Sequence, residues 1–82
     1  MGNAVLEGSV VRESGPVERA FVRLLDSKGE FTAEVATDED GAFRFFASPG
    51  EWTVRVLSTL GTHDVALEAT AGRNEVAVFL SA

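Results

Sequence analysis

The sequence contains no cysteine and no tyrosine, and it has a single histidine, His63, and a single lysine, Lys28. The lack of cysteine excludes disulfide bonds, thiolate metal sites and thiol nucleophiles. A catalytic triad needs a nucleophile, a histidine and an acid together in space, and no Gly-x-Ser-x-Gly motif presents Ser58 as a nucleophile for His63. His63 follows Gly61 closely, which favours a solvated turn. We therefore expect a protein that is not an enzyme.

Basic residues and long apolar runs are also scarce. Thirteen acidic residues against seven basic ones give a net charge of −6. This charge repels the phosphates of nucleic acids and of anionic lipids. No apolar run approaches the ~20 residues that span a bilayer, and the first residues lack the basic and apolar regions of a secretion signal. We expect a cytoplasmic protein that contacts neither nucleic acid nor membrane.

Metal and cofactor motifs are missing as well. Asp38, Glu39 and Asp40 offer oxygen ligands of the kind that calcium prefers, but the EF-hand spacing with its distal glutamate is not there. An Asp-Gly pair that closes a hairpin explains the same residues. No glycine-rich segment precedes a helix, so phosphate-binding loops have no place. The sequence predicts no metal and no cofactor.

What the sequence does contain is a series of short apolar runs separated by turn residues. Glycine supplies positive φ and proline fixes φ, so clusters of these residues end strands. Short strands at this spacing are typical of a sandwich or barrel, and no segment has a sustained helical period. We predict one all-β domain over residues 1–82, a seven-stranded antiparallel β-sandwich with strands near residues 4–11, 19–26, 30–37, 42–47, 51–58, 63–68 and 74–80.

The alternation of side chains predicts which face of each strand is buried, because successive residues in a strand point to opposite faces. Trp52, Phe43 and Phe45 are expected to be the main anchors, since large apolar side chains gain most from burial. The full inward set is Leu6, Gly8, Val10, Ala20, Val22, Leu24, Phe43, Phe45, Trp52, Val54, Val56, Val76, Val78 and Leu80.

Three blocks of sequence resemble carboxypeptidase regulatory-like domains. They are Gly8-Ser9-Val10 with Gly15-Pro16-Val17 and Ala20-Phe21-Val22-Arg23-Leu24, then the Thr37…Asp40-Gly41-Ala42-Phe43 block, and Pro49-Gly50-Glu51-Trp52-Thr53-Val54. The resemblance covers most of the chain and implies a transthyretin-like (prealbumin-like) sandwich of seven strands. Some related surface domains carry a Lys–Asn isopeptide bond, which is not expected here because Lys28 lies in a predicted exposed turn.

A closer likeness is to small actinobacterial proteins of unknown function, the SseC type, whose genes accompany a thiosulfate sulfurtransferase. Phe21-Val22-Arg23-Leu24-Leu25-Asp26, Glu30-Phe31-Thr32-Ala33-Glu34-Val35 and Phe43-Arg44-Phe45-Phe46-Ala47 carry this likeness. It implies a context in sulfur metabolism and a sulfurtransferase as protein partner, and it implies no activity.

The outward positions hold arginines and apolar residues on an otherwise acidic chain. Exposed apolar patches mark interaction sites, and arginine and aromatic residues are enriched at interface hot spots. We predict that this surface docks a protein partner or a second copy of the chain. In transthyretin-like sandwiches the second and fifth strands are neighbours, so Arg23 and Arg55 should share one outer face. The predicted interaction residues are Phe21, Arg23, Leu25, Arg44, Phe46, Arg55 and Leu57.

Several questions stay open at the level of sequence. Arg44 and Phe46 join this face only if the strand at residues 42–47 enters the same sheet. The arginines could instead pair with carboxylates such as Glu7 and Asp26, which would leave a solvated sheet face worth little energetically. The alternative function is a small-ligand or carbohydrate-binding module that uses loop residues such as Asp38, Asp40 and His63.

Overall fold

The structure, a computed structural model, describes residues 3–59 and 61–80, which consist of strands and their connecting turns. The all-β prediction is confirmed, but the described residues form eight strands rather than seven. The additional strand, β2, is two residues long, which is too short for any alternation to reveal. The described residues include no helix of the length and apolarity that a membrane span requires. The strands are β1 (Ala4–Arg12), β2 (Gly15–Pro16), β3 (Phe21–Leu25), β4 (Phe31–Ala36), β5 (Ala42–Ala47), β6 (Gly50–Ser58), β7 (Gly61–Ala69) and β8 (Gly72–Leu80).

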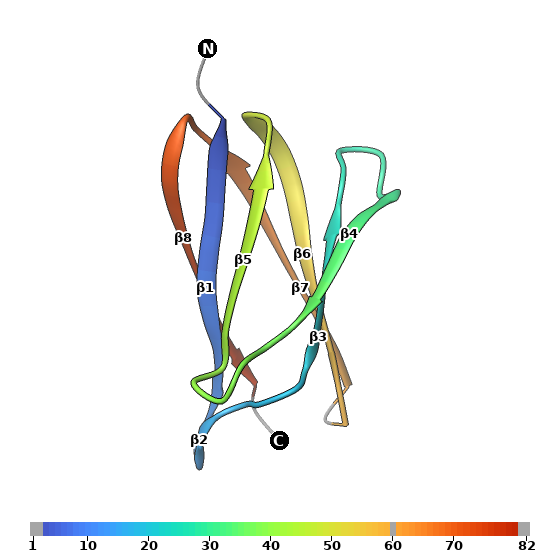
Figure 1. The fold of residues 1–82 in the computed structure, drawn as a ribbon. Coiled ribbons are helices and arrows are strands. Elements are labelled where there is room, and N and C mark those ends of the chain that lie inside the picture. The colour runs from blue at the N-terminus through green and yellow to red at the C-terminus, as the bar shows by residue number, and fades with distance from the viewer. Residues whose placement is uncertain (1–2, 60, 81–82) are drawn as a thin grey trace.

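The strands form two sheets that face each other as a sandwich (Figure 1). In the first sheet β1 is central, with β5 and the short β2 as antiparallel partners and β8 as a further partner. The second sheet has the order β4-β3-β6-β7 and is antiparallel throughout.

One strand pair differs from the predicted antiparallel arrangement. β8 runs parallel to β1 along the whole of both strands, from Ala4 beside Gly72 to Arg12 beside Leu80. Parallel neighbours need a long crossover connection. Here the chain between the first and last strands supplies this connection, because it crosses to the second sheet and back twice, with β5 in the first sheet between the two crossings. The prediction of a fully antiparallel sandwich is therefore wrong for this pair.

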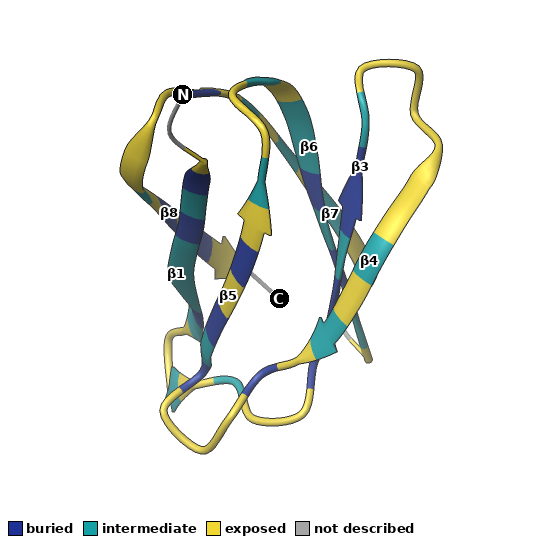
Figure 2. Cartoon of the chain, turned by 45° about the horizontal axis from the view of Figure 1, so that its top comes forward, coloured by how far each residue is buried: buried dark blue, intermediate teal, exposed yellow. Residues whose placement is uncertain are grey.

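The core lies between the sheets and follows the predicted alternation (Figure 2). Phe43 and Phe45 are buried, and their rings lie 6.0 Å apart. Trp52, predicted to be a main anchor with Phe43 and Phe45, is only partly buried. It packs against the core cluster, and its Nε1 donates a hydrogen bond to the Ser48 carbonyl at 2.8 Å. The buried core residues are Ala4, Leu6, Val10, Ala20, Val22, Leu24, Phe43, Phe45, Val54, Val56, Ala69, Val76, Val78 and Leu80.

Two turns of the same design flank β4. In each an aspartate carboxylate accepts two backbone N–H groups at 2.9 Å, Asp26 from Lys28 and Glu30, and Asp38 from Asp40 and Ala42. The glycine three residues after each aspartate has a positive φ, 80° at Gly29 and 75° at Gly41, a conformation that glycine adopts without steric cost. Within the acidic stretch at residues 38–40, the Asp38 carboxylate is thus engaged in forming the turn.

Candidate interaction site

The residues predicted to form one interaction face lie on both sides of the sandwich. β5 pairs with β1, so Arg44 and Phe46 point outward from the first sheet. Arg23 and Arg55 stand directly opposite each other on β3 and β6, in the second sheet. The prediction that these two arginines share an outer face is confirmed, and Arg44 and Phe46 do not belong to it.

Leu25 is the second departure from the predicted face. It is buried, with 5% of its surface exposed, although it is not part of the core cluster. The pairing of β3 with β4 shifts at this point, because Leu24 pairs with Ala33 whereas Leu25 pairs with Phe31. Such a bulge breaks the regular alternation of side chains. Leu25 therefore offers no surface to a partner.

The outer surface of the second sheet carries one charged row across all four strands. The row reads Glu34, Arg23, Arg55, Asp64, with each residue in register with the next. Arg23 Nε lies 2.6 Å from Glu34 Oε2. Arg55 is bidentate to Asp64, with Nε at 2.8 Å from Oδ1 and Nη2 at 3.0 Å from Oδ2. The carboxylates on the two edge strands thus hold the two central arginines in place.

Apolar side chains flank this charged row. Phe21 lies on one side with 53% of its surface exposed, paired with the half-buried Leu57. Phe31 lies on the other side with 62% exposed, and the Arg23 guanidinium is 5.9 Å from its ring centre, within the range of a cation–π interaction. We call the surface formed by Phe21, Arg23, Phe31, Glu34, Arg55, Leu57 and Asp64 the arginine face.

The Arg55–Asp64 pair makes a testable prediction about pH. The hydrogen bond from Arg55, reinforced by its charge, lowers the pKa of Asp64 below its ordinary value of 3.8 and raises the pKa of Arg55. Since the folded-state pKa of Asp64 is depressed, the pair stabilises the fold above pH ~4, and this contribution is lost as the pH falls further. Carboxyl-carbon NMR should show Asp64 titrating at lower pH than it does in Arg55→Met. Equal titration midpoints in both proteins would contradict the pairing.

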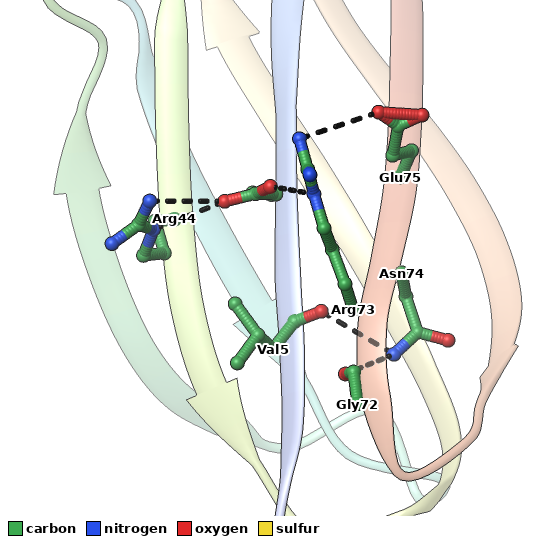
Figure 3. Close-up of polar contacts among 7 residues, drawn as sticks. Val5, Arg44, Gly72, Arg73, Asn74 and Glu75 are labelled. Carbon is green, nitrogen blue, oxygen red and sulfur yellow. Dashed lines mark hydrogen bonds and ion pairs between the residues drawn. The ribbon is translucent and has the colours of Figure 1, made fainter.

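The outer surface of the first sheet carries a second charge cluster. The Glu7 carboxylate lies between Arg44, with Nη2 at 3.1 Å, and Arg73, which also contacts Glu75 at 3.7 Å (Figure 3). On one side of this row lie the small side chains of Ala42, Ser9 and Ala77. They line a shallow hollow of about 790 Å³ together with the charged row and with part of β4. We call this surface the β1 face; its outward residues are Val5, Glu7, Ser9, Val11, Pro16, Ala42, Arg44, Phe46, Arg73, Glu75, Ala77 and Phe79.

Asp38, Asp40 and His63, the residues of the alternative ligand-binding hypothesis, do not form one site. His63 lies within β7 rather than in a turn and is half-buried, and its Nδ1 is buried without a hydrogen-bond partner. The Asp38 carboxylate is engaged in its own turn. Among residues 3–59 and 61–80, no group of three histidine, cysteine, aspartate or glutamate side chains is placed to hold a metal ion.

Residues 1–80 match the family described as "Protein of unknown function (DUF1416)". The chain belongs to the DUF1416 family. It is 55% identical over 76 residues to an uncharacterized protein of Mycolicibacterium smegmatis, covering 90% of this chain and 84% of that protein. It is 53% identical over 76 residues to the uncharacterized protein Rv0814c of Mycobacterium tuberculosis, covering 90% of this chain and 76% of the relative. The predicted likeness to actinobacterial proteins of unknown function is confirmed by these members.

Solved structures of distant sequence share the fold of this DUF1416 member. The Bacillus anthracis TIE protein superposes with a TM-score of 0.78 at 16% identity, covering 98% of this chain and 17% of that chain. A DUF3823 family protein from Parabacteroides merdae superposes with a TM-score of 0.73 at 15% identity, covering 96% of this chain and 46% of that chain. The 3-chlorocatechol 1,2-dioxygenase from Rhodococcus opacus superposes with a TM-score of 0.71 at 11% identity, covering 99% of this chain and 60% of that chain. This chain spans less than two thirds of the length of each of these proteins. The likeness to them shows the fold alone.

Proposed function

We propose that this protein is a non-catalytic interaction domain with a transthyretin-like fold, which docks a protein partner on the arginine face. The observation that carries the proposal is the side-by-side placement of Arg23 and Arg55, with the exposed Phe21 and Phe31 on either side of Arg23. About two fifths of each arginine side chain is exposed, 43% for Arg23 and 38% for Arg55. Both guanidiniums are therefore oriented by their carboxylates and still accessible.

This geometry defines the chemistry of the partner. Like charges directly opposite each other on neighbouring strands are unfavourable, so a carboxylate placed between Arg23 and Arg55 would relieve their repulsion and accept hydrogen bonds from both. Apolar side chains on either side of that carboxylate would cover Phe21 and Phe31. Exclusion of water by such contacts strengthens a central charged pair. The partner should thus present an acidic residue within an apolar surface.

The family resemblance supports a thiosulfate sulfurtransferase as that partner, which would place the protein in cytoplasmic sulfur metabolism. The same resemblance supports the transthyretin-like subtype of the sandwich. The lack of a nucleophile–base pair in the sequence supports a non-catalytic role.

The proposal is tested by titrating the thiosulfate sulfurtransferase of the same cell with this protein in a calorimeter. Arg23→Glu/Arg55→Glu should weaken binding at least tenfold, because two attractive charges become repulsive at the centre of the contact. Arg44→Glu, a reversal on the opposite side of the sandwich, is the matched control and should bind like the wild type. Equal binding by all three proteins, or no binding by the folded wild type, would overturn the proposal.

A further inference from the structure

The β1 face is complementary to itself, and this property is independent of the arginine face. The registers of β1 with β5, β2 and β8 arrange its outward residues in four rows. Two end rows are mainly apolar, one middle row is charged, and the other middle row is small. In order along β1 the rows are Phe46–Val5–Arg73, Arg44–Glu7–Glu75, Ala42–Ser9–Ala77 and Pro16–Val11–Phe79.

Two such faces can be related by a two-fold axis that lies between the sheets and runs across the strands. With the axis at the level between Glu7 and Ser9, each strand lies over its own copy and the order of the rows is reversed. The charged row of each copy then covers the small row of the other, and the end rows cover each other. Sheets that pack face to face keep their strands within about 30° of alignment, so these row-to-row contacts are preserved.

The contacts that result contain no like-charge pair. Arg44 and Glu75 lie over Ala42 and Ala77 of the second copy, where the hollow leaves room for them. The face carries two arginines and two glutamates and has no net charge, although the whole chain carries −6. The remaining contacts are Glu7 over Ser9, Val5 over Val11, Phe46 over Pro16 and Phe79 over Arg73.

The exposure of Phe46 and Phe79 also supports contact of this face with a second copy. Phe46 has 71% of its surface exposed and Phe79 has 61%. In the two-fold arrangement Phe46 gains an apolar contact on Pro16, and Phe79 gains a cation on its ring, which is favourable for an aromatic side chain. Glu7, which contacts both Arg44 and Arg73, and Glu75, which contacts Arg73, together neutralise the two arginines within one copy (Figure 3). Burial of this cluster therefore needs no charge from outside.

We infer that the β1 face binds a second copy of this chain, so that the protein forms a symmetric dimer through its first sheet and leaves both arginine faces free. Three strands and four rows give a contact of about 400 Å² on each copy. This is at the small end of protein interfaces, where complexes are weak and transient. The dimer should therefore appear only at high protein concentration.

The test is sedimentation velocity over a range of concentrations, with two substitutions at the exposed Ala77 that differ in the sign of their charge. Ala77→Glu places a carboxylate opposite Glu75 of the second copy and should weaken the dimer at least tenfold. Ala77→Arg places a guanidinium opposite the same Glu75 and should retain or tighten it. At Ala42, which meets Arg44, the signs are reversed: Ala42→Arg should weaken the dimer and Ala42→Glu should retain it.

The outcomes separate this inference from the proposed function. Arg23→Glu/Arg55→Glu should dimerise like the wild type, even though it is expected to lose the foreign partner. A wild type that stays monomeric at millimolar concentration would overturn the inference, as would equal effects of both charges at Ala77. Loss of the dimer in Arg23→Glu/Arg55→Glu would place the second copy on the arginine face and would likewise overturn it.

Discussion

Gly8→Ala is expected to lower the free energy of unfolding by about 4 kcal/mol or more, among the largest losses that single substitutions cause. Gly8 lies in the middle of β1, between Phe43 on β5 and Val76 on β8. A Cβ at this position would overlap the Val76 carbonyl oxygen and would lie 2.7 Å from the carbonyl carbon and 3.2 Å from the tip of the Phe43 ring. The obstacle is backbone, which cannot rotate away, so β1 and β8 would have to separate.

Urea denaturation measures this loss, with Ser9→Ala as the matched control on the neighbouring outward position. The control should change stability little, because an exposed-face substitution away from special features has a small effect. Amide hydrogens of β8 should also exchange faster in Gly8→Ala than in the control, since the parallel pairing is what the new Cβ disrupts. A loss below about 1 kcal/mol in Gly8→Ala would contradict the close approach of the two strands.

Thr37→Val is expected to cost about 3 kcal/mol, because it leaves two backbone groups without hydrogen bonds. Thr37 is buried, with 3% of its surface exposed, and its hydroxyl donates to the Val17 carbonyl at 2.6 Å and accepts from the Ala20 N–H at 2.9 Å. The segment it binds includes Arg19, whose φ of 62° is unusual for a residue with a side chain. The hydroxyl therefore holds a strained connection between β2 and β3 against the end of β4.

Thr37→Ser is the matched control for this prediction, because serine keeps the hydroxyl and loses only a methyl group. Thermal or urea unfolding should show a clearly smaller loss for Thr37→Ser than for Thr37→Val. If Thr37→Val cost no more than Thr37→Ser, the two hydrogen bonds of the hydroxyl would not be the main contribution of Thr37, which would contradict this account.

The sequence pattern predicted which side chains are buried more successfully than it predicted where the strands lie. The alternation at Phe43 and Phe45 is correct, because a strand with one buried face imposes it. Both sheets bury one face, however, so the same alternation does not say which sheet β5 enters. The sequence therefore leaves open whether Arg44 lies on the same face as Arg23. The direction in which β8 pairs with β1 does not affect the alternation of its side chains, and β2 is too short to show any alternation. The sequence pattern therefore predicts neither feature.

The interaction site was only partly predictable for the same physical reason. The alternation of side chains predicts that Arg23 and Arg55 point outward, and the family resemblance predicts that their two strands are neighbours. Their partners, Glu34 and Asp64, depend on the register of edge strands, which the pattern of single strands does not contain. Regular alternation predicts that Leu25 points outward. The shift in pairing with β4 beside it breaks this alternation, and the sequence of β3 alone does not contain that shift.

The docking of a partner on the arginine face is tested most directly by backbone amide NMR of the labelled protein during titration with the sulfurtransferase. Amide signals of Phe21, Arg23, Arg55 and Leu57 should shift, while those of β5 and of the outward positions of β1 stay in place. Shifts confined to β1, β5 and β8, with β3 and β6 unaffected, would contradict the account and assign partner recognition to the opposite side of the sandwich.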